Sequence, residues 1–209
     1  MPEATLVIAC GAVAREIMAL KRRYGWNHLH LKCIDARLHN RPGEIPGRVR
    51  KLIAENRTAF PRIFVAYADC GTAGALDEVL EETGVQRLPG AHCYQFLAGH
   101  RRFDELSRDN PGTFYVTDFL VRHFERFVIE PLGLDRHPEL RDAYFGNYSR
   151  LVYLSQSGDA TLVAAARLAA ERLSLPFEHV HCGYGELETE LYRRLDRWGG
   201  DQDDLRVLA

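Results

Sequence analysis

Hydrophobic and polar positions along the chain follow two periods in turn. Short apolar runs of strand length occur at Thr5–Cys10, Arg62–Ala68 and Arg150–Gln156, and such runs are typical of buried strands. Between them lie segments whose apolar residues recur at helical spacing, such as Ala12–Tyr24 and Asp159–Leu173. Strands that alternate with helices of this length predict βαβ units and a parallel sheet.

Weaker signals complete this pattern. The alternation in His28–Ile34 predicts a half-buried strand, and Phe177–His181 predicts another. We therefore predict a Rossmann-like α/β fold with a mostly parallel sheet and helices on both faces, with two similar lobes as the alternative to one. We treat residues 1–209 as a single α/β domain with a possible weak lobe boundary near 131–149, where the pattern is irregular. The other predicted elements are helices at Pro46–Asn56, Thr72–Thr83, Ala91–Leu97, Asp118–Ile129 (capped by Asp118) and Tyr184–Leu195, and a short strand at Val85–Leu88.

The composition narrows the class of protein. The chain has 209 residues, of which 46% are hydrophobic, and this is enough for a core of useful size. A formal net charge of −2 argues against nucleic acid or an anionic membrane as a partner. No window reaches the roughly 18 apolar residues that span a bilayer, and the start MPEATLVIACG lacks the basic region of a signal peptide. We expect a cytoplasmic protein whose five cysteines remain free thiols.

Three of the predicted strands are followed by the same dipeptide: Cys10-Gly11, Cys70-Gly71 and Cys182-Gly183. The carboxyl ends of parallel strands meet at one edge of a sheet, and ligands bind at that edge. A helix begins soon after each dipeptide, and its N-terminus should lower the pKa of the thiol. Glycine allows a ligand to approach the backbone closely, so Gly11 and Gly71 are candidate cofactor-binding residues.

Histidines add to these candidates. His92-Cys93 follows the next short strand, His39 lies in the loop after the second strand, and His181 precedes Cys182. Cysteine and histidine are the usual ligands of zinc, and cysteine-rich sets also suit iron–sulfur clusters. The chain has no C-x-x-C pair, so a metal site must be assembled from distant segments. Each cysteine taken alone is more often a small buried side chain, which is our interpretation of Cys33. The predicted metal ligands are Cys10, Cys70, His92, Cys93 and Cys182.

Five motifs in order make the chain similar to a known family: IACGAVAREI, DARLHNRPGEI, YADCGTAG, PGAHCYQFLAG and NPGTFYVTDFL. The chain resembles the uncharacterised prokaryotic family catalogued as domain of unknown function 1638, from about Leu6 to His181. The resemblance implies a small cytoplasmic α/β protein of bacteria and archaea, whose genes often lie near corrinoid-dependent methyltransferases. It implies no established activity. Many relatives read HDC where this chain has His92-Cys93-Tyr94, so His92 matches and Cys93 takes the place of an acid.

Three hypotheses of function follow. The first is a metal-binding protein, with zinc as the default metal, acting in corrinoid-linked one-carbon (methyl transfer) metabolism. The second is a metal-free thiol enzyme in which Cys70 is the nucleophile and Asp69 and His92 orient or deprotonate it. The third is a non-catalytic module that binds a corrinoid or a partner protein. His39 would then be an axial ligand, although the DxHxxG pattern usual for that role is absent. The substrate, the reaction and the catalytic residues stay open.

Overall fold

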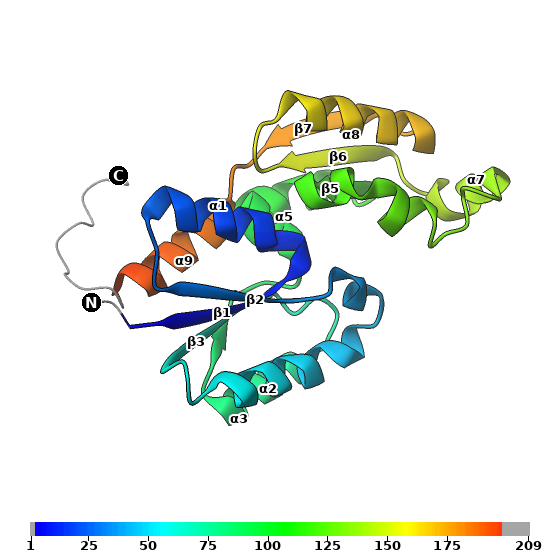
Figure 1. Ribbon diagram of the computed structural model, residues 1–209. Helices are drawn as coiled ribbons and strands as arrows, with labels where there is room; N and C mark the ends of the chain where they lie inside the picture. Colours follow the sequence, from blue (N-terminus) through cyan, green and yellow to red (C-terminus); the bar gives the residue numbers. More distant parts are fainter. Residues whose placement is uncertain (1–2, 198–209) are drawn as a thin grey trace. The chain divides into compact units, whose positions relative to one another are not determined.

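The fold was obtained as a computed structural model, which describes residues 3–197 (Figure 1). Its strands form two parallel sheets, one of four strands and one of three. Each sheet belongs to its own compact unit: residues 3–96 with 186–197 form the first, and residues 97–185 form the second. The prediction of an α/β fold with parallel strands is confirmed.

The first sheet has the strand order β2-β1-β3-β4, and every neighbouring pair is parallel. The central strand β1 is buried along its whole length except at its last residue, Cys10. This burial on both faces explains its continuous apolar run. Figure 1 shows α1 and α9 on one face of the sheet and α2 and α3 on the other. The strands are β1 (Thr5–Cys10), β2 (Leu29–Ile34), β3 (Arg62–Ala66) and β4 (Gln86–Arg87). The helices are η1 (Gly11–Val13), α1 (Ala14–Tyr24), η2 (Ala36–Asn40), η3 (Pro42–Glu44), α2 (Ile45–Asn56), α3 (Ala75–Thr83), α4 (Cys93–Ala98) and α9 (Gly185–Arg197).

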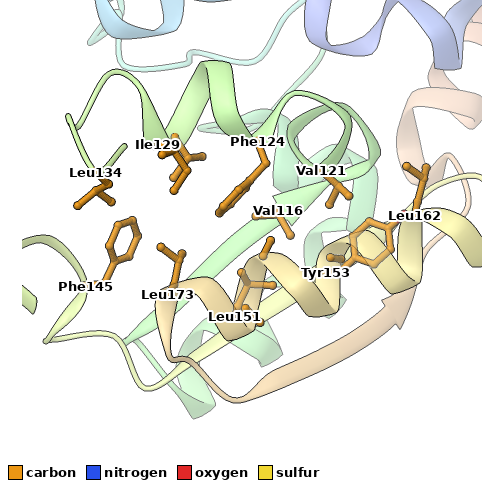
Figure 2. Packing of buried hydrophobic residues seen from close by; sticks show 14 residues of the cluster. Val116, Val121, Phe124, Ile129, Leu134, Phe145, Leu151, Tyr153, Leu162 and Leu173 are labelled. Atoms are coloured by element: carbon orange, nitrogen blue, oxygen red, sulfur yellow. The ribbon is translucent and has the colours of Figure 1, made fainter. Parts of the chain in front are cut away.

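The second sheet has the strand order β5-β6-β7 and is also parallel. On one face, Leu151 and Tyr153 of β6 pack into a core with side chains of α8 and of residues 118–130 (Figure 2). On the other face α5 covers the sheet, since the ring of Phe103 lies 4.9 Å from that of Tyr115. The strands are β5 (Thr113–Thr117), β6 (Arg150–Ser155) and β7 (Phe177–His181). The helices are α5 (His100–Asp109), α6 (Asp118–Arg122), the π-helix η4 (Glu125–Ile129), η5 (Pro138–Leu140), α7 (Arg141–Phe145) and α8 (Ala160–Leu173).

The helix predicted at Asp118–Ile129 differs from the observed one in two ways. It breaks after Arg122 and continues as a π-helix from Glu125. Its cap is Thr117, whose hydroxyl accepts a hydrogen bond from the Leu120 N–H at 3.5 Å, so the prediction that Asp118 is the cap is wrong. The carboxylate of Asp118 is buried and binds the loop after β6 instead.

Several elements were not predicted, among them α5, β5 and the short helix α7 of the second unit. The segment HRRFDELSRD of α5 has only two apolar residues, Phe103 and Leu106, which is too few to show a helical period. The strand β5 is short and directly follows Pro111-Gly112, a turn signal. The predicted boundary near 131–149 lies inside the second unit, whereas the contacts divide the chain at 96/97 and at 185/186. Within residues 3–197, no helix is long and apolar enough to cross a membrane.

Candidate functional site

The thiols of Cys10, Cys70 and Cys93 lie close together at the carboxyl edge of the first sheet, and Tyr67 interacts with Cys10, Cys70 and Cys33. Cys10 is the last residue of β1, and its thiol accepts a hydrogen bond from the hydroxyl of Tyr67, which follows β3 and is 2% exposed. The thiol of Cys70 accepts a hydrogen bond from the backbone N–H of Cys93. Cys10, Cys70 and Cys93 also act on one another electrostatically, which requires them to be close. Three of the five predicted metal ligands thus lie near one another, and their binding of a metal stays a prediction.

The turn after β3 presents Cys70 in an unusual backbone conformation. Cys70 has a φ of 52° and Ala73 a φ of 53°, values that favour glycine. The backbone N–H of Cys70 donates to the carbonyl of Ala91 at 2.7 Å, which ties this turn to the segment that carries Cys93. Strained residues persist only where the surroundings hold them, and they cluster at functional sites. The strain at Cys70 therefore marks this turn as a candidate site.

The carboxylate of Asp69 forms its hydrogen bonds within the same turn. It accepts hydrogen bonds from the backbone N–H groups of Gly71 and Gly74, at 3.1 and 3.0 Å, and from the hydroxyl of Thr72 at 2.7 Å. A further bond comes from the backbone N–H of Ala73 at 3.2 Å. These bonds hold the pKa of Asp69 below its usual range, although burial alone would raise it. Asp69 stabilises the turn, and its oxygens are occupied there.

The pKa values of all three thiols are raised, which contradicts the prediction that helix N-termini lower them. Burial is the main cause in each case. It raises the pKa of Cys70 to about 12, with a further contribution from Cys10. The helix that follows Cys70 begins only at Ala75, so its positive end is remote. In the fold as it stands, these cysteines are protonated near neutral pH.

His92 directly precedes Cys93 in the sequence, and His39 of η2 acts on it electrostatically. Burial lowers the pKa of the half-buried His92, and the nearby His39 lowers it further. His39 itself is exposed on η2. Gly11 and Gly71 each have a structural role. A Cβ on Gly11 would lie 3.3 Å from the carbonyl oxygen of Ile34, and Gly71 has a φ of +83°, a conformation that favours glycine. Their role in cofactor binding stays a prediction.

The structure contradicts the predicted positions of Cys182 and Cys33. Cys182 follows β7 of the second sheet, so the expectation that three Cys-Gly turns share the edge of one sheet is wrong: the strands form two sheets. The backbone N–H of Cys182 donates to the carbonyl of Ser155 at 2.9 Å, and burial raises the pKa of its thiol. Cys33 was interpreted as a buried side chain, but it is exposed on β2.

Within residues 3–197, no group of three or more His, Cys, Asp or Glu side chains is arranged so that it could hold a metal ion.

The second sheet carries a polar cluster of its own, which the sequence reasoning missed. The buried hydroxyl of Ser155 lies 2.8 Å from Nε2 of His179 and 3.0 Å from Nδ1 of His181. The ring of His179 stacks on Tyr153 at 5.4 Å, and burial, followed by the nearby His181, lowers the pKa of His179. The spacing of the two histidines on one strand is visible in the sequence. Their shared partner is not, because it depends on the register that pairs Ser155 with His181.

The role of Asp118 was not predicted from the sequence either. Its side chain is 1% exposed and accepts hydrogen bonds from the Tyr153 hydroxyl at 2.6 Å and the Gln156 N–H at 2.9 Å. Ser157 donates through its N–H at 3.1 Å and through its hydroxyl at 2.5 Å. Burial alone would raise the pKa of Asp118, but these donors outweigh burial and the pKa is lowered. In the sequence, an acidic residue between a strand and a helix looks the same whether it caps the helix or is buried, so the pattern wrongly predicted a cap.

Comparison with known proteins identifies the family. The model of the family described as a protein of unknown function (DUF1638) matches residues 33–191. The match begins in β2, so the first motif, IACGAVAREI, lies outside the matched range. No curated protein matches the chain. The matched range covers more than half of the chain and includes four of the five motifs noted in the sequence, and this chain belongs to the DUF1638 family.

Proposed function

We propose that the thiols of Cys10, Cys70 and Cys93 bind a soft divalent metal ion, with zinc as the default. The observation that supports this is the convergence of these three thiols from three separate segments of the chain. Thiolate sulfur is the ligand that zinc and related soft ions prefer. A cluster of three thiols at the carboxyl edge of a parallel sheet also lies where α/β folds bind their ligands.

The raised pKa values agree with a site that needs a cation. Thiolates close to one another repel, and a bound cation removes this repulsion. Binding would release one proton for each thiol that coordinates, so affinity would rise with pH. The side chains do not already form a ligand group, so they would have to rotate about χ1 as the ion enters. The lowered pKa of His92 keeps its imidazole neutral near pH 7, the form that binds metals, and His92 is the candidate for a nitrogen ligand.

The metal-free thiol enzyme has less support. A nucleophilic Cys70 would need a lowered pKa, whereas burial raises it to about 12. The oxygens of Asp69 are occupied by the turn, so Asp69 does not serve as the base. For the corrinoid- or partner-binding module, the exposed His39 on η2 is the residue to test. The link to corrinoid-dependent methyl transfer rests on the family resemblance, and no reaction follows from the geometry.

The decisive test is a titration of chelator-treated protein with Co²⁺, which absorbs strongly only when thiolates coordinate it. We expect the thiolate-to-cobalt absorption band in the wild type and in Cys33→Ser, because Cys33 is exposed on β2 and, although close enough to act on Cys10 electrostatically, is not one of the proposed ligands. The band should be lost or much weakened in Cys70→Ser. Equal bands in wild type and Cys70→Ser, or none in the wild type, would contradict the proposal. Visible absorption of protein purified without chelator would reveal an iron–sulfur cluster or a corrinoid instead, and titrating Cys182→Ser would test whether that residue takes part.

A further inference from the structure

The second unit contains a pocket of about 400 Å³ between residues 121–130 and α8. This volume lies within the range of sites that bind small molecules. Its apolar lining includes Val121, Phe124, Ala165 and Ala169, and Leu168 at its rim is 64% exposed. Val121 and Phe124 also belong to the core of the unit, as Figure 2 shows, so the wall that they form is firmly supported.

One wall of the pocket is irregular in a way that points to a site. Residues Glu125–Ile129 form a π-helix, in which the N–H of Glu130 donates to the carbonyl of Glu125 at 2.8 Å. A π-helix has hydrogen bonds from residue i+5 to residue i, is rare, and is frequently found at functional sites. Glu125, Arg126 and Glu130 of this widened stretch all line the pocket.

Charged side chains of both signs line the pocket. Three arginines line it, and Arg172 is paired with Glu125. The guanidinium of Arg126 lies over the ring of Phe127, at 5.7 Å, and no carboxylate partner for it occurs in residues 3–197. The remaining lining acid, Glu130, is exposed to solvent. The pocket therefore offers cationic groups beside an apolar wall.

Arg122 supplies the most specific feature. Its Nη2 lies 3.4 Å from Asp118, whose oxygens already accept shorter bonds from Tyr153, Gln156 and Ser157. Its Nη1 is buried and has no hydrogen-bond partner within the described part of the chain. A buried donor without a partner is costly, and an anionic acceptor that reached it would remove that cost.

We propose that this pocket binds a small organic anion that joins an apolar tail to a carboxylate or phosphate head. Arg122 and Arg126 contact the head, and the tail lies against Val121, Ala165 and Ala169. This site lies in the second unit, and its test does not depend on the metal site proposed for the first.

The test uses octanoate, octyl phosphate and octanol as probes, each displacing a fluorescent apolar anion, anilinonaphthalene sulfonate, from the protein in the presence of chelator. We expect displacement by octanoate or octyl phosphate at concentrations at least ten times lower than by octanol. Arg122→Gln should weaken binding of the better anion about tenfold, the effect of losing one charge-assisted hydrogen bond. The control Arg101→Gln, on the exposed surface of α5 and outside the pocket, should leave it unchanged.

A second variant tests the same pocket in case Arg122→Gln does not fold. Ala165→Phe fills the pocket from α8, keeps Arg122 in the chain and should abolish displaceable binding. Hydrogen exchange should show that the better anion protects residues 121–130 in the wild type and not in Ala165→Phe. Equal displacement by octanol, or unchanged binding in both pocket variants, would overturn the proposal. The head that binds better identifies the ligand as a carboxylate or a phosphate ester.

Discussion

The substitution Asp118→Asn tests how the second unit is held together. The wild-type carboxylate is 1% exposed and accepts bonds at both oxygens. One oxygen takes the Tyr153 hydroxyl and the Gln156 N–H, and the other takes the N–H and hydroxyl of Ser157. Whichever way an asparagine amide is turned, its NH₂ group faces one of the two backbone donors. That N–H then stays buried without a partner.

The magnitude follows from these contacts. A hydrogen bond to a charged group contributes about 1.5–3 kcal/mol, and a neutral one contributes about 1 kcal/mol. Asp118→Asn loses one of these four charge-assisted bonds and reduces the other three to neutral bonds, so it should lower the free energy of unfolding by at least about 3 kcal/mol. Tyr153→Phe removes one bond and keeps the ring in the core, so it should cost about 2 kcal/mol. Both are large fractions of the 5–15 kcal/mol typical of a domain.

The effect should depend on pH. The pKa of Asp118 is lowered in the folded state, so its contribution is present above the unfolded pKa of about 3.9 and is lost as the pH falls through the folded value. Urea unfolding followed by far-ultraviolet circular dichroism, with hydrogen exchange on β6 as a local readout, measures the change at pH 7 and at pH 3. Asp142→Asn, an exposed acid of the same unit, is the matched control. A loss below 1 kcal/mol at pH 7, or an equal loss at both pH values, would refute the reasoning.

Two further predictions concern the first unit. Ala73→Gly should raise stability by about 0.5–1 kcal/mol in urea unfolding, because a φ of 53° strains alanine and not glycine; a loss of stability would show that the turn is not strained. Burial and a hydrogen bond to Glu188 raise the pKa of Tyr24 to about 12, so stability should fall as the pH rises from the unfolded value of about 10 towards 12. Ultraviolet titration of Tyr24 should show this pKa fall in Glu188→Gln, and an unchanged titration would remove Glu188 as a cause.

Several strands of the fold could be predicted from the sequence because burial requires a continuous run of apolar residues. A parallel strand covered on both faces must be apolar throughout, and Thr5–Cys10 and Arg150–Ser155 show this directly. Helices with a clear apolar face, such as α8, could be predicted equally well from the sequence. The structure adds that Asp159 caps α8, because its carboxylate accepts a hydrogen bond from the Thr161 N–H at 2.8 Å. The polar helix α5 and the short strand β5 lacked such a pattern, so only their packing against each other reveals them.

The candidate site was predictable only in part. The sequence by itself placed Cys10, Cys70 and Cys93 at the ends of strands or at helix starts, since local periodicity marks those ends. It could not assign strands to sheets, and so it grouped Cys182 with the other cysteines.

Tertiary structure decided the rest, because burial and hydrogen bonding depend on neighbours that are distant in sequence. These neighbours raise the thiol pKa values that the helix-dipole argument expected to fall. They also turn Asp118 from an expected cap into a buried acceptor at the end of β5. Local sequence fixes where each side chain stands on its own helix or strand, and the packing of the sheets fixes which other groups it meets.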